Sequence, residues 1–281
     1  MKFSMNMLLW TDNCLDDKYL PKFEALKKMG YDGVEIPIFA PEPAKYAALG
    51  KKLDALGLER TCVTISVPEA NPISPDAANR KKAVENLKAV LDCCQAGGMQ
   101  MLVGPLYAAL GQFSGAGPTQ DEWKWGVDSI RPVAEYGRKL GIGLALEALN
   151  RFEIYLLNTA ADSNRFAVEV GIPGTGTLYD TFHSNIEEKS ISGAVNACAP
   201  TLKHVHISEN DRSTPGKGNV RWEENFKALK EARYDGWLCI EAFGQAMPTL
   251  VSATKIWRRM FVDEETLARE GLAFMKKMAA A

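Results

Sequence analysis

Four side chains that could bind a metal ion or move a proton recur at regular intervals in the second half of the sequence. Each lies in or directly after a short apolar segment, and about one βα unit, roughly 25 to 35 residues, separates each from the next: Glu147, Asp180, His206 and Glu241. Three carboxylates and one imidazole suit a divalent cation with open coordination positions, such as Mn²⁺, Co²⁺ or Mg²⁺, better than a closed structural zinc site. The spacing therefore predicts a metal centre if the fold brings the four side chains together.

Each of these residues taken alone has a simpler explanation. A single glutamate in a strand is more often a paired core group, and a single histidine is more often a hydrogen-bonded core residue. Together they favour a metal, because converging buried carboxylates repel one another and lose hydration unless a cation compensates them. His204, in the same segment as His206, is expected to face the surrounding helices and to be structural.

The elements that must position these residues follow a repeated order of amphipathic helix, glycine and short apolar strand. Six stretches show it, among them KFEALKKMGYDGVEIPI and VAEYGRKLGIGLALEAL, and two further strands are expected at Phe3–Leu9 and Leu202–Ser208. Glycine ends a helix in the left-handed conformation at little steric cost. This explains the positions of Gly30, Gly57, Gly98 and Gly141.

Eight such units in 281 residues predict an α/β fold, a (β/α)8 TIM barrel with a single domain over residues 1–281. An open doubly wound sheet would want a glycine-rich turn after the first strand, and Trp10–Asn13 contains no glycine. A barrel places its chemistry at the C-terminal ends of its strands. The loop-like segments Pro68–Asp76 and Leu106–Gln120 would form part of that rim.

The composition argues against several kinds of partner. The formal net charge is −2 and the chain has only three histidines, so we expect no nucleic-acid surface and no attraction to anionic membranes. No apolar segment is long enough to span a bilayer. Six scattered cysteines without metal-binding spacing fit a reduced, cytoplasmic protein.

Four sequence segments resemble those of a known family: LEALNRFEIYLLNTA, YDTFHSNIEE, HVHISENDRSTPGKG and IEAF. The chain resembles the ketose 3-epimerases of the D-tagatose, D-allulose (psicose) and L-ribulose type, within the xylose isomerase-like barrels. The resemblance runs from the first strand to the WRR segment near the C-terminus. It implies a metal-dependent isomerase that acts on free ketoses and assembles as a homodimer or homotetramer.

The resemblance also implies roles for individual residues. The metal, Mn²⁺ or Co²⁺ before Mg²⁺, would be held by Glu147, Asp180, His206 and Glu241, and Glu147 and Glu241 would also form the acid–base pair. The carbonyl and hydroxyl end of the sugar would contact Glu153, His183 and Arg212. The far end would be enclosed by apolar and aromatic side chains, for which the candidates are Trp10, Cys62, Tyr107 and Phe243.

Two departures from the family pattern leave the preferred ketose open. The loop GPLYAALGQF lacks a tryptophan that some D-allulose-type members carry, and Ser184 stands where methionine is common. The expected reaction removes the C3 proton beside the carbonyl, with the metal stabilising the enediolate, and a second glutamate returns a proton on the opposite face. Glu147 and Glu241 come from different strands and could flank the sugar.

Other functions remain open at this point. An aldose–ketose isomerase on the same barrel would move a proton between C1 and C2, and a non-catalytic barrel would bind a sugar without converting it. An endonuclease-type barrel is disfavoured by the low histidine count and the slightly acidic charge. The apolar segment Thr249–Phe261 could belong to a subunit interface or to the outer ring of helices.

Overall fold

The computed structural model describes all 281 residues and contains a closed barrel of eight parallel strands. The strands are β1 Lys2–Asn6, β2 Gly33–Pro37, β3 Glu59–Val63, β4 Met101–Gly104, β5 Gly143–Glu147, β6 Thr175–Asp180, β7 Leu202–Ile207 and β8 Trp237–Ile240. Each strand pairs with the next in sequence, and β1 pairs with β8 to close the ring. The predicted (β/α)8 fold is confirmed.

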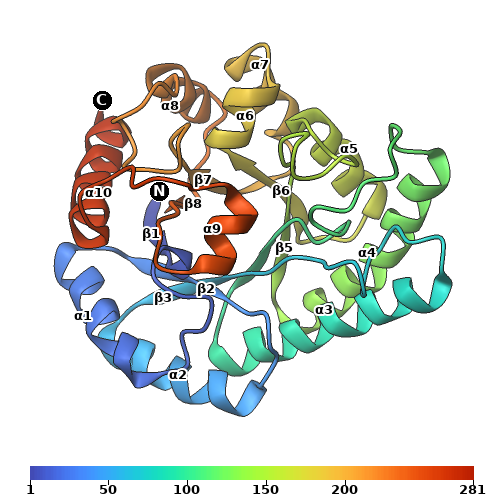
Figure 1. Cartoon of the computed structure of the whole chain (residues 1–281), viewed down its shortest axis with the longest axis horizontal. Helices are drawn as coiled ribbons and strands as arrows, with labels where there is room; N and C mark the ends of the chain where they lie inside the picture. The colour runs from blue at the N-terminus through green and yellow to red at the C-terminus, as the bar shows by residue number, and fades with distance from the viewer.

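Helices surround the barrel and alternate with its strands (Figure 1). They are α1 Leu20–Met29, α2 Pro43–Leu56, α3 Ala77–Gly97, α4 Gln120–Leu140, α5 Ala160–Val170, α6 Thr181–Glu187, α7 Ile191–Cys198, α8 Trp222–Glu231, α9 Pro248–Thr254 and α10 Glu264–Ala280. Two short 3₁₀ turns lie at Met7–Leu9 and Asp17–Tyr19. No helix is long and apolar enough to cross a membrane.

Four helices end at the glycines that were predicted from the sequence to end them. Gly57 after α2 has φ +65° and Gly141 after α4 has φ +74°, the left-handed conformation that side chains with a Cβ adopt at a cost. Gly30 and Gly98 end α1 and α3 in the same way. These caps turn the chain back toward the barrel and set where each following strand begins.

The first strand is shorter than predicted. The expected strand covered Phe3–Leu9, whereas β1 ends at Asn6 and Met7–Leu9 forms a 3₁₀ turn. The side chain of Asn6 accepts a hydrogen bond of 2.9 Å from the Leu8 backbone N–H, which stabilises this turn. As a result, Leu8 faces the mouth of the barrel instead of continuing the sheet.

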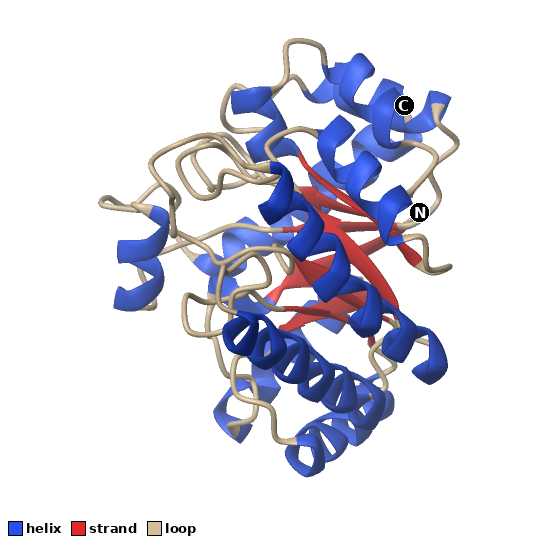
Figure 2. Ribbon diagram, turned by 90° about the vertical axis from the view of Figure 1, so that its right-hand side faces the viewer, coloured by secondary structure: helices blue, strands red, loops and turns tan.

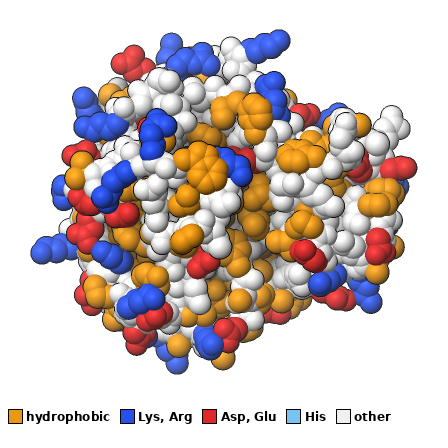
Figure 3. Space-filling view, viewed as in Figure 1, with side chains coloured by type: hydrophobic (Ala, Val, Ile, Leu, Met, Phe, Trp, Pro, Cys, Tyr) orange, Lys and Arg blue, Asp and Glu red, His pale blue; other side chains and the backbone are white.

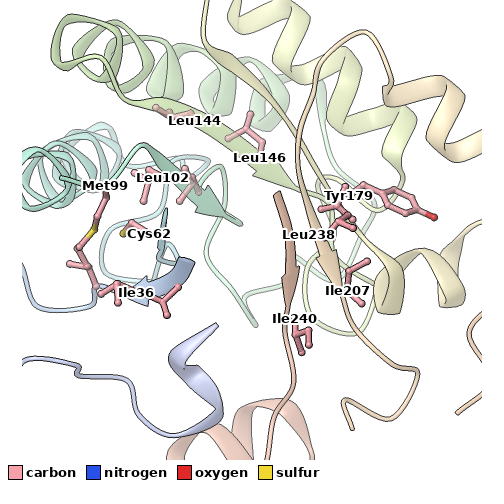
Figure 4. Close-up of a cluster of buried hydrophobic side chains, with 14 of the residues drawn as sticks. Ile36, Cys62, Met99, Leu102, Leu144, Leu146, Tyr179, Ile207, Leu238 and Ile240 are labelled. Carbon is pink, nitrogen blue, oxygen red and sulfur yellow. The ribbon is translucent and has the colours of Figure 1, made fainter. Parts of the chain in front are cut away.

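The apolar core divides between the two faces of the barrel wall. Side chains on the helix-facing side form the larger cluster, part of which is labelled in Figure 4: Ile36, Cys62, Met99, Leu102, Leu144, Leu146, Tyr179, Ile207, Leu238 and Ile240. A smaller cluster inside the barrel and at its mouth contains Leu8, Val63, Val103, Ala145, Leu178, Phe243 and Ile256. Successive strand residues point to opposite faces, so these two sets alternate along the strands.

The loops that follow the strands are gathered on one side of the barrel, opposite the N-terminus (Figure 2). The segments predicted to form this rim, Pro68–Asp76 and Leu106–Gln120, lie between elements, apart from Gln120, which begins α4. Helix α9 lies across the middle of the ring of helices in Figure 1. Residues of α9 line the mouth of the barrel, so this part of Thr249–Phe261 does not belong to the outer ring of helices, and its place in a subunit interface remains a prediction.

Candidate active site

Four potential metal ligands meet at the C-terminal ends of four neighbouring strands. Glu147 ends β5, Asp180 ends β6, His206 lies in β7 and Glu241 follows β8. All four are buried, and one ligand atom from each lies within 4.8 Å of the others. His206 Nδ1 is 3.5 Å from Glu147 Oε1, 3.7 Å from Asp180 Oδ2 and 3.5 Å from Glu241 Oε1. The structure thus brings together the four residues whose spacing suggested a metal centre.

The hydrogen bonding of this cluster fits a bound divalent cation. Glu147 Oε1 and His206 Nδ1 are buried and have no hydrogen-bond partner. Unpartnered buried polar atoms are costly, and three carboxylates so close together repel one another without positive charge between them. Carboxylate oxygens with a single imidazole nitrogen are the donors that Mn²⁺, Co²⁺ and Mg²⁺ accept.

The electrostatics of the cluster point the same way. The pKa of Glu241 is raised to about 8 by burial and by the charges of Glu147 and Asp180. Burial lowers the pKa of His206, but the carboxylates of Glu241 and Glu35 outweigh it and raise the pKa well above its usual range. Burial would raise the pKa of Asp180, but the charge of Arg212 holds it below its usual range. The cluster therefore carries excess negative charge that protons or a cation must balance.

Arg212 and His183 lie beside this cluster. Arg212 Nη1 donates hydrogen bonds to Glu241 Oε2 at 2.8 Å and to Asp180 Oδ2 at 3.4 Å, and Nη2 is 3.0 Å from His183 Nε2. The guanidinium is also packed between two rings, 3.8 Å from the centroid of Phe182 and 4.8 Å from that of Phe243. These contacts fix the cation at the wall of the site.

The backbone around Arg212 is held by a buried carboxylate. Arg212 has φ +62°, a conformation uncommon for a residue with a Cβ. Glu209 accepts hydrogen bonds from the backbone N–H groups of Gly216 and Val220 and from Trp222 Nε1, at 2.8, 3.0 and 2.9 Å. This carboxylate closes the loop after β7 and so keeps Arg212 in place.

Glu153 and His183 are connected through Asn150. The backbone N–H of Asn150 donates to His183 Nδ1 at 3.0 Å, and its side chain donates to Glu153 Oε1 at 2.8 Å. Burial lowers the pKa of His183, and the nearby guanidinium of Arg212 lowers it further. His183 Nδ1 therefore accepts a hydrogen bond from the Asn150 backbone N–H, which leaves Nε2 facing the site. Asn150 was not among the residues singled out from the sequence.

A cavity of about 430 Å³ opens above these polar residues. Its polar side chains include Glu147, Glu153, His183, Arg212 and Glu241, and more than half of its lining residues are apolar. Phe39, Phe113 and Phe152 stand at the rim and are 44%, 47% and 73% exposed. Hydrophobic side chains gather at the centre of this face in Figure 3. The cavity therefore combines a charged floor with an apolar wall.

Three of the four residues expected to form the apolar wall do not line the cavity. Phe243 does, but Trp10, Cys62 and Tyr107 are not among its lining residues. Cys62 faces the helices, because in β3 the side chains alternate and Val63 takes the inner position (Figure 4). Tyr107 is fully buried against Phe166, with its hydroxyl donating to a backbone carbonyl. Trp10 packs against the helix-side core beyond the 3₁₀ turn that shortens β1.

The prediction for His204 was wrong. His204 and His206 are two residues apart in β7, so they share one face of the strand, and both point into the barrel. Their rings are 5.2 Å apart, and both contact Glu35 in β2. Sequence reasoning missed Glu35, although a carboxylate within the apolar run VEIPI was a signal that could have identified it.

Comparison with known proteins gives consistent matches. The sequence model of the xylose isomerase-like TIM barrel family matches residues 23–278. A probable ketose 3-epimerase of Synechocystis sp. is 31% identical over 99% of this chain and 96% of its own length. A D-psicose 3-epimerase of Agrobacterium fabrum is 32% identical over 92% of this chain and 93% of its own. The crystal structure of a D-allulose 3-epimerase from Methylomonas sp. in complex with D-allulose superposes with a TM-score of 0.93 at 28% identity. That match covers 99% of this chain and 97% of the other.

Proposed function

The chain belongs to the xylose isomerase-like TIM barrel family and is an isomerase of the ketose 3-epimerase group, and we propose that it inverts C3 of unphosphorylated ketoses at a divalent metal centre. The observation that carries this proposal is the convergence of Glu147, Asp180, His206 and Glu241 beside a sugar-sized cavity, which Glu147 and Glu241 line. These four residues would hold the metal, for which Mn²⁺ or Co²⁺ is the preferred candidate. The bound cation would supply Lewis-acid stabilisation of the negative charge that develops on the sugar oxygens.

Glu147 and Glu241 would carry the proton transfer. One carboxylate removes the proton from C3, which is acidic because it lies beside the carbonyl, and the other returns a proton to the opposite face. The two glutamates come from β5 and β8, and both line the cavity. A planar intermediate between them can be protonated from either side, which is the requirement for inversion.

Three further residues would bind the polar end of the sugar. His183 Nε2 and the Arg212 guanidinium border the cavity and would donate to the carbonyl oxygen as its negative charge grows. Glu153, oriented by Asn150, would accept a hydrogen bond from a sugar hydroxyl. The apolar wall would enclose the other end of the substrate and exclude water.

The charges of the cavity favour a neutral sugar over a sugar phosphate. Arg212 and Lys255 are the two cationic side chains that line it. Arg212 is already paired with Asp180 and Glu241, and Lys255 donates a hydrogen bond to the Ser252 carbonyl. A phosphate group would therefore find no free cluster of donors. A cytoplasmic location and a homodimer or homotetramer remain predictions.

Incubation with single ketoses in D₂O tests the proposal. The metal-free protein is supplied with Mn²⁺ and given D-fructose, D-tagatose or L-ribulose in separate reactions, and products are identified by NMR. We expect the C3 epimer of at least one sugar, with deuterium at C3. Deuterium at C1 or C2 of an aldose product would instead identify an aldose–ketose isomerase. Binding without conversion of any ketose would identify a non-catalytic sugar-binding barrel.

A further inference from the structure

A buried carboxylate that the proposed reaction does not use lies next to the metal-binding residues. Glu35 is in the middle of β2 and is fully buried inside the barrel. Its Oε1 lies 2.8 Å from His206 Nε2 and accepts a hydrogen bond of 3.0 Å from Asn6. Its Oε2 accepts a hydrogen bond of 2.8 Å from Thr61 and lies 3.0 Å from His204 Nε2. Side chains from three other strands therefore hold this carboxylate in one orientation.

The contact with Glu35 decides which nitrogen of His206 carries a proton. An ionised carboxylate can only accept a hydrogen bond, so Nε2 must be the protonated nitrogen that faces it. A cation bound to the other nitrogen would take the place of a proton there, so the ligating ring would be the neutral tautomer with its proton on Nε2. The other nitrogen, Nδ1, points toward Glu147, Asp180 and Glu241 and has no hydrogen-bond partner.

We infer that Glu35 is a positioning residue that holds His206 with its proton on Nε2 and presents Nδ1 to the divalent cation. The inference rests on the proposed function, because it needs the metal centre. A carboxylate behind a ligating histidine fixes the ring and makes the ligand nitrogen more basic, and removing such a partner typically lowers metal affinity about 10- to 100-fold.

A second metal ion is the alternative reading of the same residues. Glu35, His204, His206 and Cys239 also place one possible ligand atom each within 4.8 Å of the others. Both oxygens of Glu35 already accept hydrogen bonds from neutral donors, Asn6 and Thr61. The buried Cys239 thiol donates a weak hydrogen bond of 3.8 Å to the Ile240 carbonyl, which a thiolate ligand could not do. The geometry therefore favours a hydrogen-bonded support for one metal over a second metal.

Metal titration of matched variants tests the inference. Mn²⁺ binding to the metal-free protein is measured by calorimetry at one pH for the wild type, Glu35→Gln, Thr61→Val and Glu188→Gln. Glutamine keeps the shape of Glu35 and an oxygen that can accept from His206, but it lacks the charge. Glu188 is half-buried and contacts none of the four proposed ligands, so Glu188→Gln controls for the loss of a carboxylate.

We expect the wild type to bind one Mn²⁺ per chain. Glu35→Gln should raise the dissociation constant about tenfold or more. Thr61→Val, which removes one hydrogen bond to Glu35, should raise it by a smaller factor, and Glu188→Gln should leave it unchanged. Because Thr61→Val keeps the carboxylate, it gives a result even if Glu35→Gln folds poorly.

A spectroscopic measurement separates positioning from a general structural role. With only three histidines in the chain, long-range ¹H–¹⁵N spectra of the protein loaded with diamagnetic Mg²⁺ can be assigned by substitution. We expect His206 to carry its proton on Nε2, and this proton to move upfield in Glu35→Gln as its hydrogen bond weakens.

Several outcomes would overturn the inference. They are an unchanged Mn²⁺ dissociation constant in Glu35→Gln, a proton on Nδ1 of His206, or two Mn²⁺ per chain of which Glu35→Gln loses one. A wild type that binds no Mn²⁺ would overturn the proposed metal centre itself and this inference with it. If the wild type binds Mn²⁺ and Glu35→Gln binds it with the same dissociation constant, only the role of Glu35 is overturned.

Discussion

Arg212 donates a hydrogen bond of 2.8 Å from Nη1 to Oε2 of Glu241. The matching glutamate on the other side of the cluster, Glu147, has no such cation, and its Oε1 has no hydrogen-bond partner. Asn6 adds a second, weaker donor to Glu241 at 3.3 Å. The two proposed acid–base residues therefore have different surroundings, which allows each to serve one face of the sugar.

Replacing either glutamate with glutamine should stop epimerisation. We expect Glu147→Gln and Glu241→Gln each to lower kcat at least about 10²-fold at saturating Mn²⁺, because an amide cannot take up the C3 proton. Each variant keeps the carboxylate on the other face, so it should still exchange the C3 proton of one epimer with D₂O. NMR of both epimers measures turnover and exchange together. Near-normal turnover in either variant would remove that residue from the mechanism, and Glu188→Gln is the control.

Mn²⁺ should stabilise the folded protein, because it compensates the buried carboxylates. A ligand that binds only the folded state at 100 times its dissociation constant adds about 2.7 kcal/mol to the free energy of unfolding. We expect Tm to rise with Mn²⁺ concentration and to fall back on chelation. Asp180→Asn should abolish this rise while the helix cap survives, because Oδ1 accepts from the Phe182 and His183 N–H groups and Oδ2 faces the cluster. A wild-type Tm that does not change with Mn²⁺ concentration would contradict the prediction.

Arg212→Met should weaken both substrate binding and turnover. Hydrogen bonds to charged groups contribute about 1.5–3 kcal/mol, so kcat/KM should fall about 10- to 100-fold. Arg165→Met is a matched control, because Arg165 also stacks on an aromatic ring, 3.8 Å from the Trp123 centroid, but is exposed and does not line the cavity. Steady-state kinetics of the two variants measure the loss of kcat/KM in each. Equal losses would mean that the effect of Arg212 is structural.

Cys62 in β3 and Ile65, two residues after the end of that strand, should separate stability from binding. Cys62→Ala should lower the free energy of unfolding by about 1 kcal/mol, because it leaves a small cavity in the helix-side core. It should leave KM unchanged. Ile65→Ala, at the cavity wall, should raise KM several-fold with little change in stability. Denaturant unfolding and steady-state kinetics check both. A raised KM in Cys62→Ala alone would restore Cys62 to the substrate site.

The fold class could be predicted from local signals. Apolar periodicity, the glycines at the ends of α1 to α4 and the count of eight βα units are all properties of short segments, and parallel closure follows from them. The approach of Glu147, Asp180, His206 and Glu241 could be predicted for the same reason. Parallel strands deliver their C-terminal ends to one edge, so a regular spacing in sequence becomes proximity in space.

Residues outside the regular strand ends could not be placed in this way. Trp10 and Tyr107 lie in connections whose direction depends on packing, and a single 3₁₀ turn or the contact with Phe166 is enough to move them away from the cavity. Side chains in β3 point alternately into the barrel and toward the helices, and the side on which Cys62 lies depends on which residue of the strand first points inward. Helix α9 looked like any apolar helix, and only the tertiary arrangement places it at the mouth of the barrel.

The residue types and the repeat by themselves determined the barrel, its catalytic edge and a set of acids that needs a cation. Only the tertiary structure decided how each of those groups is held. The contact between Glu35 and His206 joins residues far apart in sequence on β2 and β7, and it depends on barrel closure and on the inward direction of both side chains. Sequence patterns record which face a residue shares with its near neighbours, whereas a hydrogen bond across the barrel depends on distance and direction, which exist only once the ring is closed.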